Sequence, residues 1–239
     1  MTIELILLLL IVALASFVQT ATGFGLALVS VPLLTAVIGL QATAPFVSLF
    51  GVIAELAVLL RYREAFSLRP VLKLIVSAAV AIPIGLYLLD KIDPVLGTKL
   101  LGAFIVAYVI YAFVTPKLPE LTSGKWAFGA GFLGGLTAGL YAISGPPVII
   151  YGNCRRWLPE TFKANLQGYF LPVSLMVLFG HILSGNVTAE LWQYTLYSLP
   201  AIAIGAGLGF QLDGRINATT FNKMILVLLL IIGLKLIFT

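Results

Sequence analysis

Two of the long apolar runs in this sequence are interrupted by residues that could hold an anion. The first break lies in TATGFGLALVSVP, residues 20–32, and the second lies in YAISGPP, residues 141–147. Backbone that leaves the helix inside a membrane has unpaired N–H and C=O groups, so such breaks persist mainly where they line a cavity. A helix that restarts after Gly25 or Gly145 would point its first N–H groups and its positive dipole end into that cavity. The pattern predicts a site for a small anion.

We expect the two breaks to meet near the middle of the membrane and to form one substrate site. Polar side chains beside the breaks could donate hydrogen bonds to anionic oxygens, and their alternative role is to join two helices. The glycines and prolines could also be kinks or close-packing points, which is the role we expect for GFLGG at 131–135 and GAGLG at 205–209. The predicted substrate-binding residues are Gln19, Thr20, Thr22, Gly23, Phe24, Gly25, Tyr141, Ser144, Gly145, Pro146, Asn165 and Gln167.

Two ionisable residues inside apolar runs are candidates for moving protons. Glu55, in GVIAELAVLL, is the only acidic residue well inside such a run. An ionised carboxylate there costs about 2.5–3.5 kcal/mol on insertion scales, so it either takes up a proton or finds a partner. His181 is the only histidine, and it lies opposite Glu55 when the spacing of 126 residues between FVSL (46–49) and PVSL (172–175) is continued. We predict Glu55 and His181 as inner and outer proton relay points, with structural roles as the alternative.

The elements that must position these residues are membrane helices. Of the 239 residues, 61% are hydrophobic and 10% are charged, whereas a soluble domain carries about a quarter charged residues. Apolar runs of roughly 18 residues or more recur from end to end, which indicates one transmembrane domain over residues 1–239. The single cysteine, Cys154, excludes an internal disulfide and a thiolate metal cluster, and we expect no metal and no other cofactor. The net charge of +5 is explained by lysines and arginines in loops, which orient a membrane protein. We therefore expect the chain to lie in a lipid bilayer and to bind no nucleic acid.

The chain divides into eight apolar segments, and the pattern repeats after the fourth. The segments span residues 3–39, 42–60, 70–89, 97–115, 126–151, 164–183, 190–212 and 218–238. Three short matches, at spacings of 114, 126 and 124 residues, pair 25–32 with 139–146, 46–49 with 172–175, and 92–102 with 216–226. We therefore predict two internal repeats, about residues 1–116 and 124–239, each an interrupted segment followed by three whole helices.

The positions of lysine and arginine indicate how often an interrupted segment crosses the membrane. If residues 126–151 return as a hairpin, 11 of the 14 basic residues lie on one side, against Lys91, Lys99 and Lys235 on the other. A single crossing would divide them 7 against 7. The positive-inside rule selects the hairpin. Each half then has an odd number of net crossings, which predicts an all-α polytopic membrane protein with an inverted-topology repeat, basic loops in the cytoplasm and both termini outside.

Broken helices that meet at mid-depth between inverted repeats are typical of secondary transporters, whose helix N-termini face anionic groups. We therefore predict a secondary transporter of small anions that works by alternating access, and not an enzyme. One histidine, one cysteine and no HExxH or GxSxG motif leave an intramembrane lipid-modifying enzyme few groups to use. A membrane assembly or scaffold partner is a further alternative. The sequence leaves the oligomeric state open.

The segments ATGFGLALVSVPLL, residues 21–34, and GGLTAGLYAISGPPVIIYG, residues 134–152, resemble the two characteristic segments of the TauE/SafE sulfite exporter family of bacterial membrane proteins. The resemblance extends over essentially the whole chain, including its length, segment count and duplication. It implies export of sulfite, organosulfonates or related small sulfur-containing anions across the bacterial inner (plasma) membrane by a multi-pass protein. Family members commonly carry a longer glycine run in the first segment, where this chain has Gly23 and Gly25 around Phe24.

Overall fold

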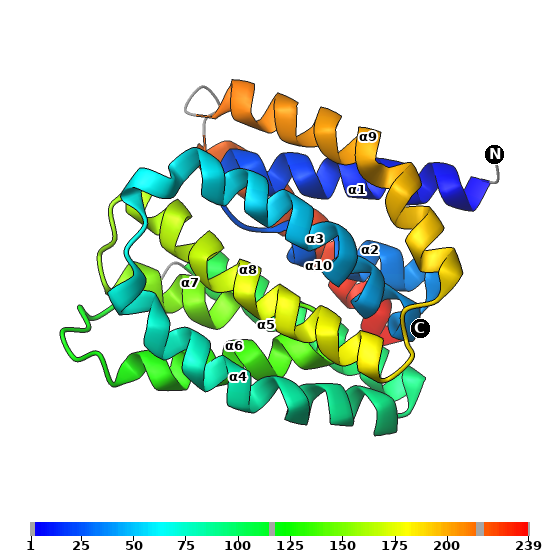
Figure 1. Ribbon diagram of the computed structural model, residues 1–239, viewed down its shortest axis with the longest axis horizontal. Coiled ribbons are helices and arrows are strands. Elements are labelled where there is room, and N and C mark those ends of the chain that lie inside the picture. Colours follow the sequence, from blue (N-terminus) through cyan, green and yellow to red (C-terminus); the bar gives the residue numbers. More distant parts are fainter. Residues whose placement is uncertain (1–2, 115–117, 214–217, 239) are drawn as a thin grey trace.

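The computed structural model describes residues 3–114, 118–213 and 218–238. These residues form α-helices and one short 3-10 helix, with no strand among them (Figure 1). The helices are α1 (Ile3–Thr22), α2 (Leu26–Ile38), α3 (Leu40–Tyr62), η1 (Arg63–Ala65), α4 (Leu68–Lys91), α5 (Pro94–Val114), α6 (Trp126–Tyr141), α7 (Gly145–Cys154), α8 (Pro159–Leu183), α9 (Ala189–Leu212) and α10 (Ala218–Phe238). The predicted all-helical class is confirmed.

Six of the described helices are long and apolar enough to cross a membrane, namely α1, α3, α4, α5, α8 and α9. Many of their outward-facing side chains are large and apolar, for example Val80, Leu100 and Ile204. Such a surface suits a lipid bilayer, where apolar side chains face apolar lipid tails. The backbone N–H and C=O groups are hydrogen-bonded within each helix and need no water. These features confirm the prediction of a polytopic membrane protein.

Each interrupted segment forms two helices separated by a short break. Residues 23–25 separate α1 from α2, and residues 142–144 separate α6 from α7. Gly23 and Gly25 have φ angles of +86° and +105°, which suit glycine because a Cβ would crowd the neighbouring backbone. The second break also contains a left-handed residue, Ala142, with a φ angle of +57°. Both breaks therefore lie where the sequence places Gly, Ser and Pro inside an apolar run.

Both interrupted segments turn back toward the end of the molecule from which they started (Figure 1). In the first half, Glu4 at the start of α1 and Ile38 at the end of α2 line the same surface pocket. In the second half, the N–H of Leu121, ahead of α6, donates to the C=O of Cys154 at the end of α7, with an N···O distance of 3.0 Å. The hairpin that the lysine and arginine count favoured is confirmed.

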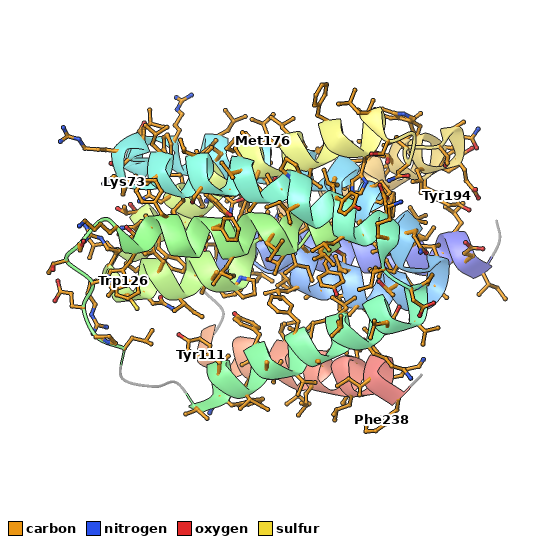
Figure 2. All side chains as sticks on the ribbon, turned by 90° about the horizontal axis from the view of Figure 1, so that it is seen from below. Lys73, Tyr111, Trp126, Met176, Tyr194 and Phe238 are labelled. Carbon is orange, nitrogen blue, oxygen red and sulfur yellow. The ribbon has the colours of Figure 1, made fainter. Side chains whose placement is uncertain are left out.

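The hairpins gather the loops at two opposite ends of the molecule. One end, which we call the basic end, holds the ends of α3, α7 and α9 and the starts of α4, α6 and α8. Figure 2 shows Lys73 and Trp126 toward this end and Phe238 toward the other. The start of α1 and the end of α10 lie at the end opposite the basic end (Figure 1). Two residues that the prediction counts at the basic end, Lys117 and Arg215, lie outside the described residues. By the positive-inside rule we expect the basic end in the cytoplasm.

Glycines let two pairs of helices approach closely. Gly131 and Gly135 of α6 face α4, and a Cβ on Gly135 would lie 2.5 Å from the Cα of Ala78. Gly205 and Gly209 of α9 face α1 in the same way, and a Cβ on either would collide with backbone carbonyls of α1. Small residues spaced by four are typical of such close contacts in membrane proteins. The packing role that we expected for GFLGG and GAGLG is confirmed.

The two halves of the chain pair their helices in the same pattern. The helix α4 of the first half packs on α6 of the second, and α9 of the second half packs on α1 of the first, while α3 packs on α8 and α5 on α10. The helices α5 and α10 begin 124 residues apart, at Pro94 and Ala218, which is the spacing of the third sequence match. The helices that follow the breaks begin 119 residues apart, at Leu26 and Gly145. The match at a spacing of 114 is therefore shifted by five residues from the alignment of the two breaks.

Candidate functional site

Two buried glutamines from different helices hold the first break. Gln19 Nε2, on α1, donates to Gln167 Oε1, on α8, at 2.9 Å. Gln19 Oε1 accepts the N–H of Leu26 that opens α2, at 3.1 Å, and Gln167 Nε2 donates to the C=O of Gly23, at 2.6 Å. These bonds satisfy backbone groups that the break would otherwise leave unpaired. In this conformation the two predicted anion ligands join helices and brace the break.

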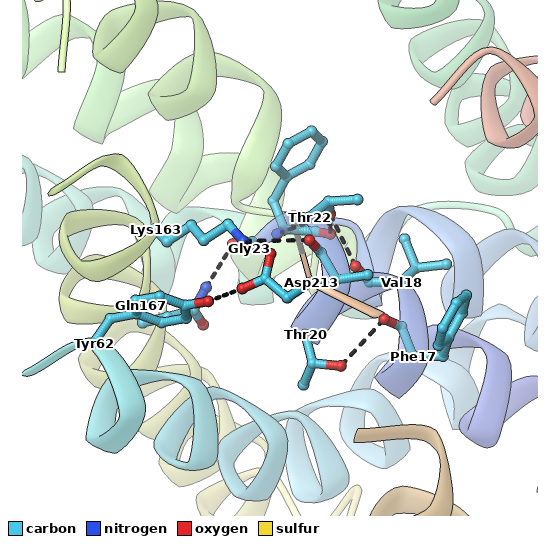
Figure 3. Close-up of polar contacts among 11 residues, drawn as sticks. Phe17, Val18, Thr20, Thr22, Gly23, Tyr62, Lys163, Gln167 and Asp213 are labelled. Atoms are coloured by element: carbon cyan, nitrogen blue, oxygen red, sulfur yellow. Dashed lines mark hydrogen bonds and ion pairs between the residues drawn. The ribbon is translucent and has the colours of Figure 1, made fainter. Parts of the chain in front are cut away.

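Gly23 leaves room for a lysine side chain that crosses the break. A Cβ on Gly23 would lie 2.5 Å from Lys163 Cγ. Lys163 Nζ donates to the C=O of Ala21, at 3.3 Å, and forms a salt bridge of 2.5 Å with Asp213 at the end of α9. Tyr62 Oη, at the end of α3, donates to the same carboxylate (Figure 3). We call Tyr62, Lys163 and Asp213 the latch, because together they tie the ends of α1, α3, α8 and α9 at the basic end.

The two threonines of the first break face different sides of α1. Thr20 Oγ1 donates to the C=O of Ser16, at 2.9 Å, and lies against Gly209 of α9. Thr22 Oγ1 donates to the C=O of Phe24 at 2.6 Å and lies 3.3 Å from the N–H of the same residue. Side chains two positions apart on a helix point in nearly opposite directions. Thr20 and Thr22 therefore cannot line one cavity, although both are of the predicted residue type.

A cavity of about 530 Å³ borders the first break on the side of α5 and α10. Thr22, Phe24 and Gly25 of the break line it, and α10 contributes Lys223. Most of the other side chains around it are aliphatic or aromatic. Three of the predicted substrate residues thus lie beside a space that is large enough for a small molecule but is separate from the second break.

The second break is capped by its own helix. The N–H of Ala142 donates to the C=O of Ala138, at 2.7 Å, and the N–H of Ile143 donates to the C=O of Thr137, at 3.3 Å. Such bonds around a left-handed residue are a common way for a helix to end. The residues Pro146–Pro147 open α7 and carry no N–H group, so this helix has fewer free donors at its start than α2 has.

The two breaks converge on a small space between α3 and α8, which lie side by side in Figure 1 and which we call the central cavity. Residues beside both breaks line it: Leu26, Ala27, Ala142 and Ser144. The polar side chains that α3 and α8 contribute are Ser48, Glu55 and Ser174. The volume of about 10 Å³ is at the lower limit for one water molecule. Of the predicted substrate residues, Ser144 is the one in this lining.

Glu55 lies in the wall of the central cavity. Its Oε1 accepts a hydrogen bond from Ser174 Oγ at 2.9 Å, and its Oε2 has no hydrogen-bond partner among the described residues. His181, in the last turn of α8, is fully buried toward the end opposite the basic end. Its Nδ1 lies 3.4 Å from Asn186 Nδ2, and its Nε2 has no partner in the described part of the chain. The two predicted relay residues thus have different surroundings.

The remaining predicted residues lie apart from the central cavity. Tyr141 Oη donates to a backbone carbonyl at the start of α5, at 3.2 Å. Pro146 lines an apolar cavity of about 420 Å³ between α5, α6 and α7, and Gly145 faces an aromatic ring of α8. Asn165 Oδ1 accepts the N–H of Ser67, at 2.9 Å, beside a pocket at the basic end.

The latch and Ser174 were missed by the sequence analysis. Lys163 and Asp213 are 50 residues apart and lie beside loops, where charged residues are common, so no local pattern links them. Ser174 could have been found, because the match of FVSL with PVSL pairs it with Ser48, and both line the central cavity. Among the described residues, no group of three or more His, Cys, Asp or Glu side chains lies together as a metal site would need.

Comparison with known protein families finds a match over nearly the whole chain. The family model described as "Sulfite exporter TauE/SafE" matches residues 8–236, which include both breaks, the central cavity and the latch. The chain belongs to the TauE/SafE sulfite exporter family. This membership, together with the six apolar helices, makes the chain a multi-pass bacterial membrane protein of a transporter family.

The chain is also similar to a protein that is named as an exporter. The probable sulfite/organosulfonate exporter TauE of Cupriavidus necator is 25% identical to this chain over 228 residues. The aligned region covers 92% of this chain and 89% of the relative, so the two proteins correspond over nearly their whole lengths. No solved structure matches the chain at a significant level.

Proposed function

We propose that this TauE/SafE protein is a secondary transporter that exports sulfite, organosulfonates or related small sulfur-containing anions. The observation that carries the proposal is the convergence of two broken helices, one from each half of the chain, on the central cavity. Secondary transporters hold their substrates where broken helices meet at the interface of two repeats. The name of the Cupriavidus relative supports the substrate class. Membership in a transporter family leaves an intramembrane enzyme or a scaffold without support.

The size of the central cavity supports alternating access. A space of about 10 Å³ accommodates no more than one water molecule, and sulfite is larger than water. The anion must therefore meet a wider form of the cavity, open first to one end and then to the other. The latch holds helix ends from both halves of the chain together at the basic end. Its release would accompany opening toward that end.

The matching packing of the two halves supports an inverted repeat. The pairs α4 with α6 and α9 with α1 are equivalent under exchange of the halves, and α3 with α8 and α5 with α10 are each paired with their own counterpart. In such a repeat the two halves can exchange conformations, so that the two open states are related by the pseudo-two-fold axis between the repeats. The repeats that we propose remain about residues 1–116 and 124–239.

Glu55 makes the proton a candidate coupling ion. An ionised carboxylate and an anion in one small cavity repel each other strongly, because little water screens them. A proton on Glu55 removes this repulsion and adds a hydrogen-bond donor for the anion. Among the described residues that α2, α3, α6 and α8 place in the cavity wall, Glu55 is the titratable one. We propose that anion and proton bind together there, with His181 as a second proton-binding group nearer the opposite end.

Counterflow of radiolabelled sulfite into proteoliposomes that contain the purified chain alone tests the transport proposal. We expect saturable uptake that is absent from empty liposomes and that falls in Ser144→Ala and Ser174→Ala. Ser198→Ala is a matched control, since Ser198 is a fully buried serine on α9, outside the cavity. Absence of uptake with the wild-type chain contradicts the proposal, and an equal loss in Ser198→Ala contradicts the location of the site.

Flux under an imposed pH gradient tests the coupling. Glu55→Gln keeps the shape of the side chain but cannot lose a proton, so we expect counterflow to persist and its dependence on the pH gradient to disappear. His181→Gln is expected to weaken that dependence. If both variants keep the pH dependence of the wild-type chain, the two residues are structural and the coupling proposal fails.

A further inference from the structure

The basic end contains a second pocket whose residues suit an anion. This pocket, of about 550 Å³, lies among the start of α4, the segment ahead of α6, the end of α7 and the first turns of α8. Of the described residues that line it, three are cationic, Arg69, Lys73 and Arg155, and none is acidic. We propose that this pocket binds a small oxyanion, the sulfonate or sulfite group of the exported substrate, before the substrate enters the transport path. The identity of the anion rests on the proposed function.

None of the three cations of the pocket forms a salt bridge with an acidic side chain among the described residues. The salt bridge found among the described residues joins Lys163 to Asp213 and involves none of them. Arg155 Nη1 donates to the backbone carbonyls of residues 121–122, at 2.6 and 2.8 Å, but its Nε is buried and has no partner in the described part of the chain. Like charges that share one pocket repel each other, and an anion between them converts this repulsion into attraction.

A buried amide group points to the same ligand. Asn165 is fully buried and lines the pocket from α8. A backbone N–H can only donate, so the bond from the N–H of Ser67 fixes the facing atom of Asn165 as Oδ1 and leaves Nδ2 as a donor. Nδ2 has no acceptor among the described residues. Buried donors are nearly always paired, and an oxyanion in the pocket would supply the acceptor.

The first turn of α4 adds a further attraction for negative charge. Ser67 is the N-cap residue of α4, and its side chain makes no capping hydrogen bond to the helix. The N–H groups of Leu68 and Arg69 and the positive dipole end of α4 therefore remain available, whereas Pro70 carries no N–H group. These features act together with the cations and with Asn165, so the pocket combines charge, directed donors and a helix terminus.

The walls of the pocket favour an organic anion. Tyr151 and Trp157 line it and pack edge to face, with ring centroids 5.8 Å apart. Their rings provide an apolar surface on which the carbon chain of an organosulfonate can lie while its sulfonate group meets the cations. The volume is within the range of about 300–1,000 Å³ that is usual for small-molecule sites. The location at the basic end, expected in the cytoplasm, is where an exporter takes up its substrate.

Tryptophan fluorescence gives a direct readout of this pocket. With Trp126→Phe and Trp192→Phe in the full chain, Trp157 becomes the single reporter. We expect sulfoacetate, at constant ionic strength, to change its emission saturably in nanodiscs of zwitterionic lipid. Arg69→Gln combined with Lys73→Gln should weaken the apparent affinity about tenfold or more, because each removes a charged hydrogen-bond donor. Arg63→Gln combined with Lys125→Gln is the matched control, with the same loss of charge at the same end, and should change the affinity less than about twofold.

Three results would overturn the proposal: no saturable response of Trp157, equal weakening by the two double variants, or loss of the response when phosphatidylglycerol is added to the nanodiscs. The last result would assign the pocket to a lipid headgroup.

Counterflow measurements separate this proposal from the proposed transport function. Flux of sulfoacetate with an unresponsive Trp157 refutes the pocket alone, whereas a responsive Trp157 without flux refutes transport and leaves an oxyanion site. With both intact, Arg69→Gln/Lys73→Gln should raise the half-saturating concentration and keep the maximal rate.

Discussion

The two breaks occupy corresponding places in the two halves of the chain, yet they are held in different ways. At the first break, Gln19 and Gln167 bind backbone groups on both sides, and Lys163 crosses over Gly23. At the second break, the N–H groups of Ala142 and Ile143 return to α6, and no hydrogen bond from another helix reaches residues 142–144 in the described part of the chain. A break in a membrane helix thus needs either partners from elsewhere or a cap of its own.

This difference predicts how each break responds to change. The conformation of the first break depends on α8, so substitution of Gln167 or Lys163 should destabilise the start of α2. The second break depends on its own backbone and on apolar packing, so it should tolerate substitution and should be freer to shift against α3 and α8. We expect the stability of the molecule to be concentrated at the first break.

The largest effect should come from Gly23→Ala. The new Cβ would occupy a left-handed conformation and would lie 2.5 Å from Lys163 Cγ. Strain and overpacking together should lower the free energy of unfolding by roughly 2–4 kcal/mol. Gly185→Ala separates the two causes, because Gly185, which ends α8, has a φ angle of +71° but no atom within 4 Å of a Cβ. It should cost about 1 kcal/mol. Unfolding in micelles measures both, and equal losses would show that Lys163 is not packed as described.

A double-mutant cycle at the glutamine pair should give the next largest effect. Gln19→Leu removes the acceptor of the Leu26 N–H and the partner of Gln167, all buried, so it should cost about 1–3 kcal/mol. Gln167→Leu should cost a similar amount. The double variant should cost less than the sum, with a coupling energy of about 1 kcal/mol. Additive losses would mean that the two amides do not act as one unit.

Removing the charge of the latch should have a smaller effect on stability. Asp213→Asn keeps the shape of the side chain and removes the salt bridge to Lys163. The side chain of Lys163 is 14% exposed and that of Asp213 is 17% exposed. We expect a loss of about 1 kcal/mol that shrinks at high salt, because the pair is partly open to water. Glu64→Gln is the control, since this exposed acid in η1 forms no salt bridge with any residue that the structure describes. Identical salt dependence of stability in the two variants would contradict the latch.

The smallest effect should come from Gly145→Ala, at the second break. A Cβ there would lie 3.4 Å from Ile149 Cδ1 and 3.8 Å from Phe170, which are ordinary contacts, and the φ angle is not left-handed. The change in unfolding free energy should stay within about 0.5 kcal/mol. A loss as large as that of Gly23→Ala would remove the contrast between the breaks.

Much of the fold follows from local features of the sequence. Apolar runs of membrane length mark the long helices. Gly23, Gly25 and Ser144 mark the breaks, because small residues that favour non-helical backbone stand out in an apolar run. The hairpins follow from lysine and arginine positions, since the bilayer imposes one rule on every loop. These predictions do not depend on the orientation of each helix about its own axis, that is, on which side chains face which neighbour.

The site depends on the orientation of each helix about its axis, and the sequence alone does not give this orientation. Thr20 and Thr22 have the same chemistry but point to different neighbours. Gln19 and Gln167 are 148 residues apart, and their pairing results from how α1 and α8 pack. Glu55 was predicted to matter because burying a carboxylate is costly, and that argument needs only its place in an apolar run. Its position at the central cavity required the packing of α3 against α8.

Protection of a cysteine in the central cavity tests most directly whether the anion passes there. The chain has one cysteine, so Cys154→Ser gives a clean background for Ser144→Cys. In proteoliposomes with active counterflow, sulfoacetate should slow the reaction of Ser144→Cys with a maleimide and leave the exposed loop variant Ser123→Cys unchanged. Slowing that reaches half its maximum at the half-saturating concentration for transport is the expected result. Labelling of Ser144→Cys that is indifferent to saturating sulfoacetate would contradict passage of the anion through the central cavity.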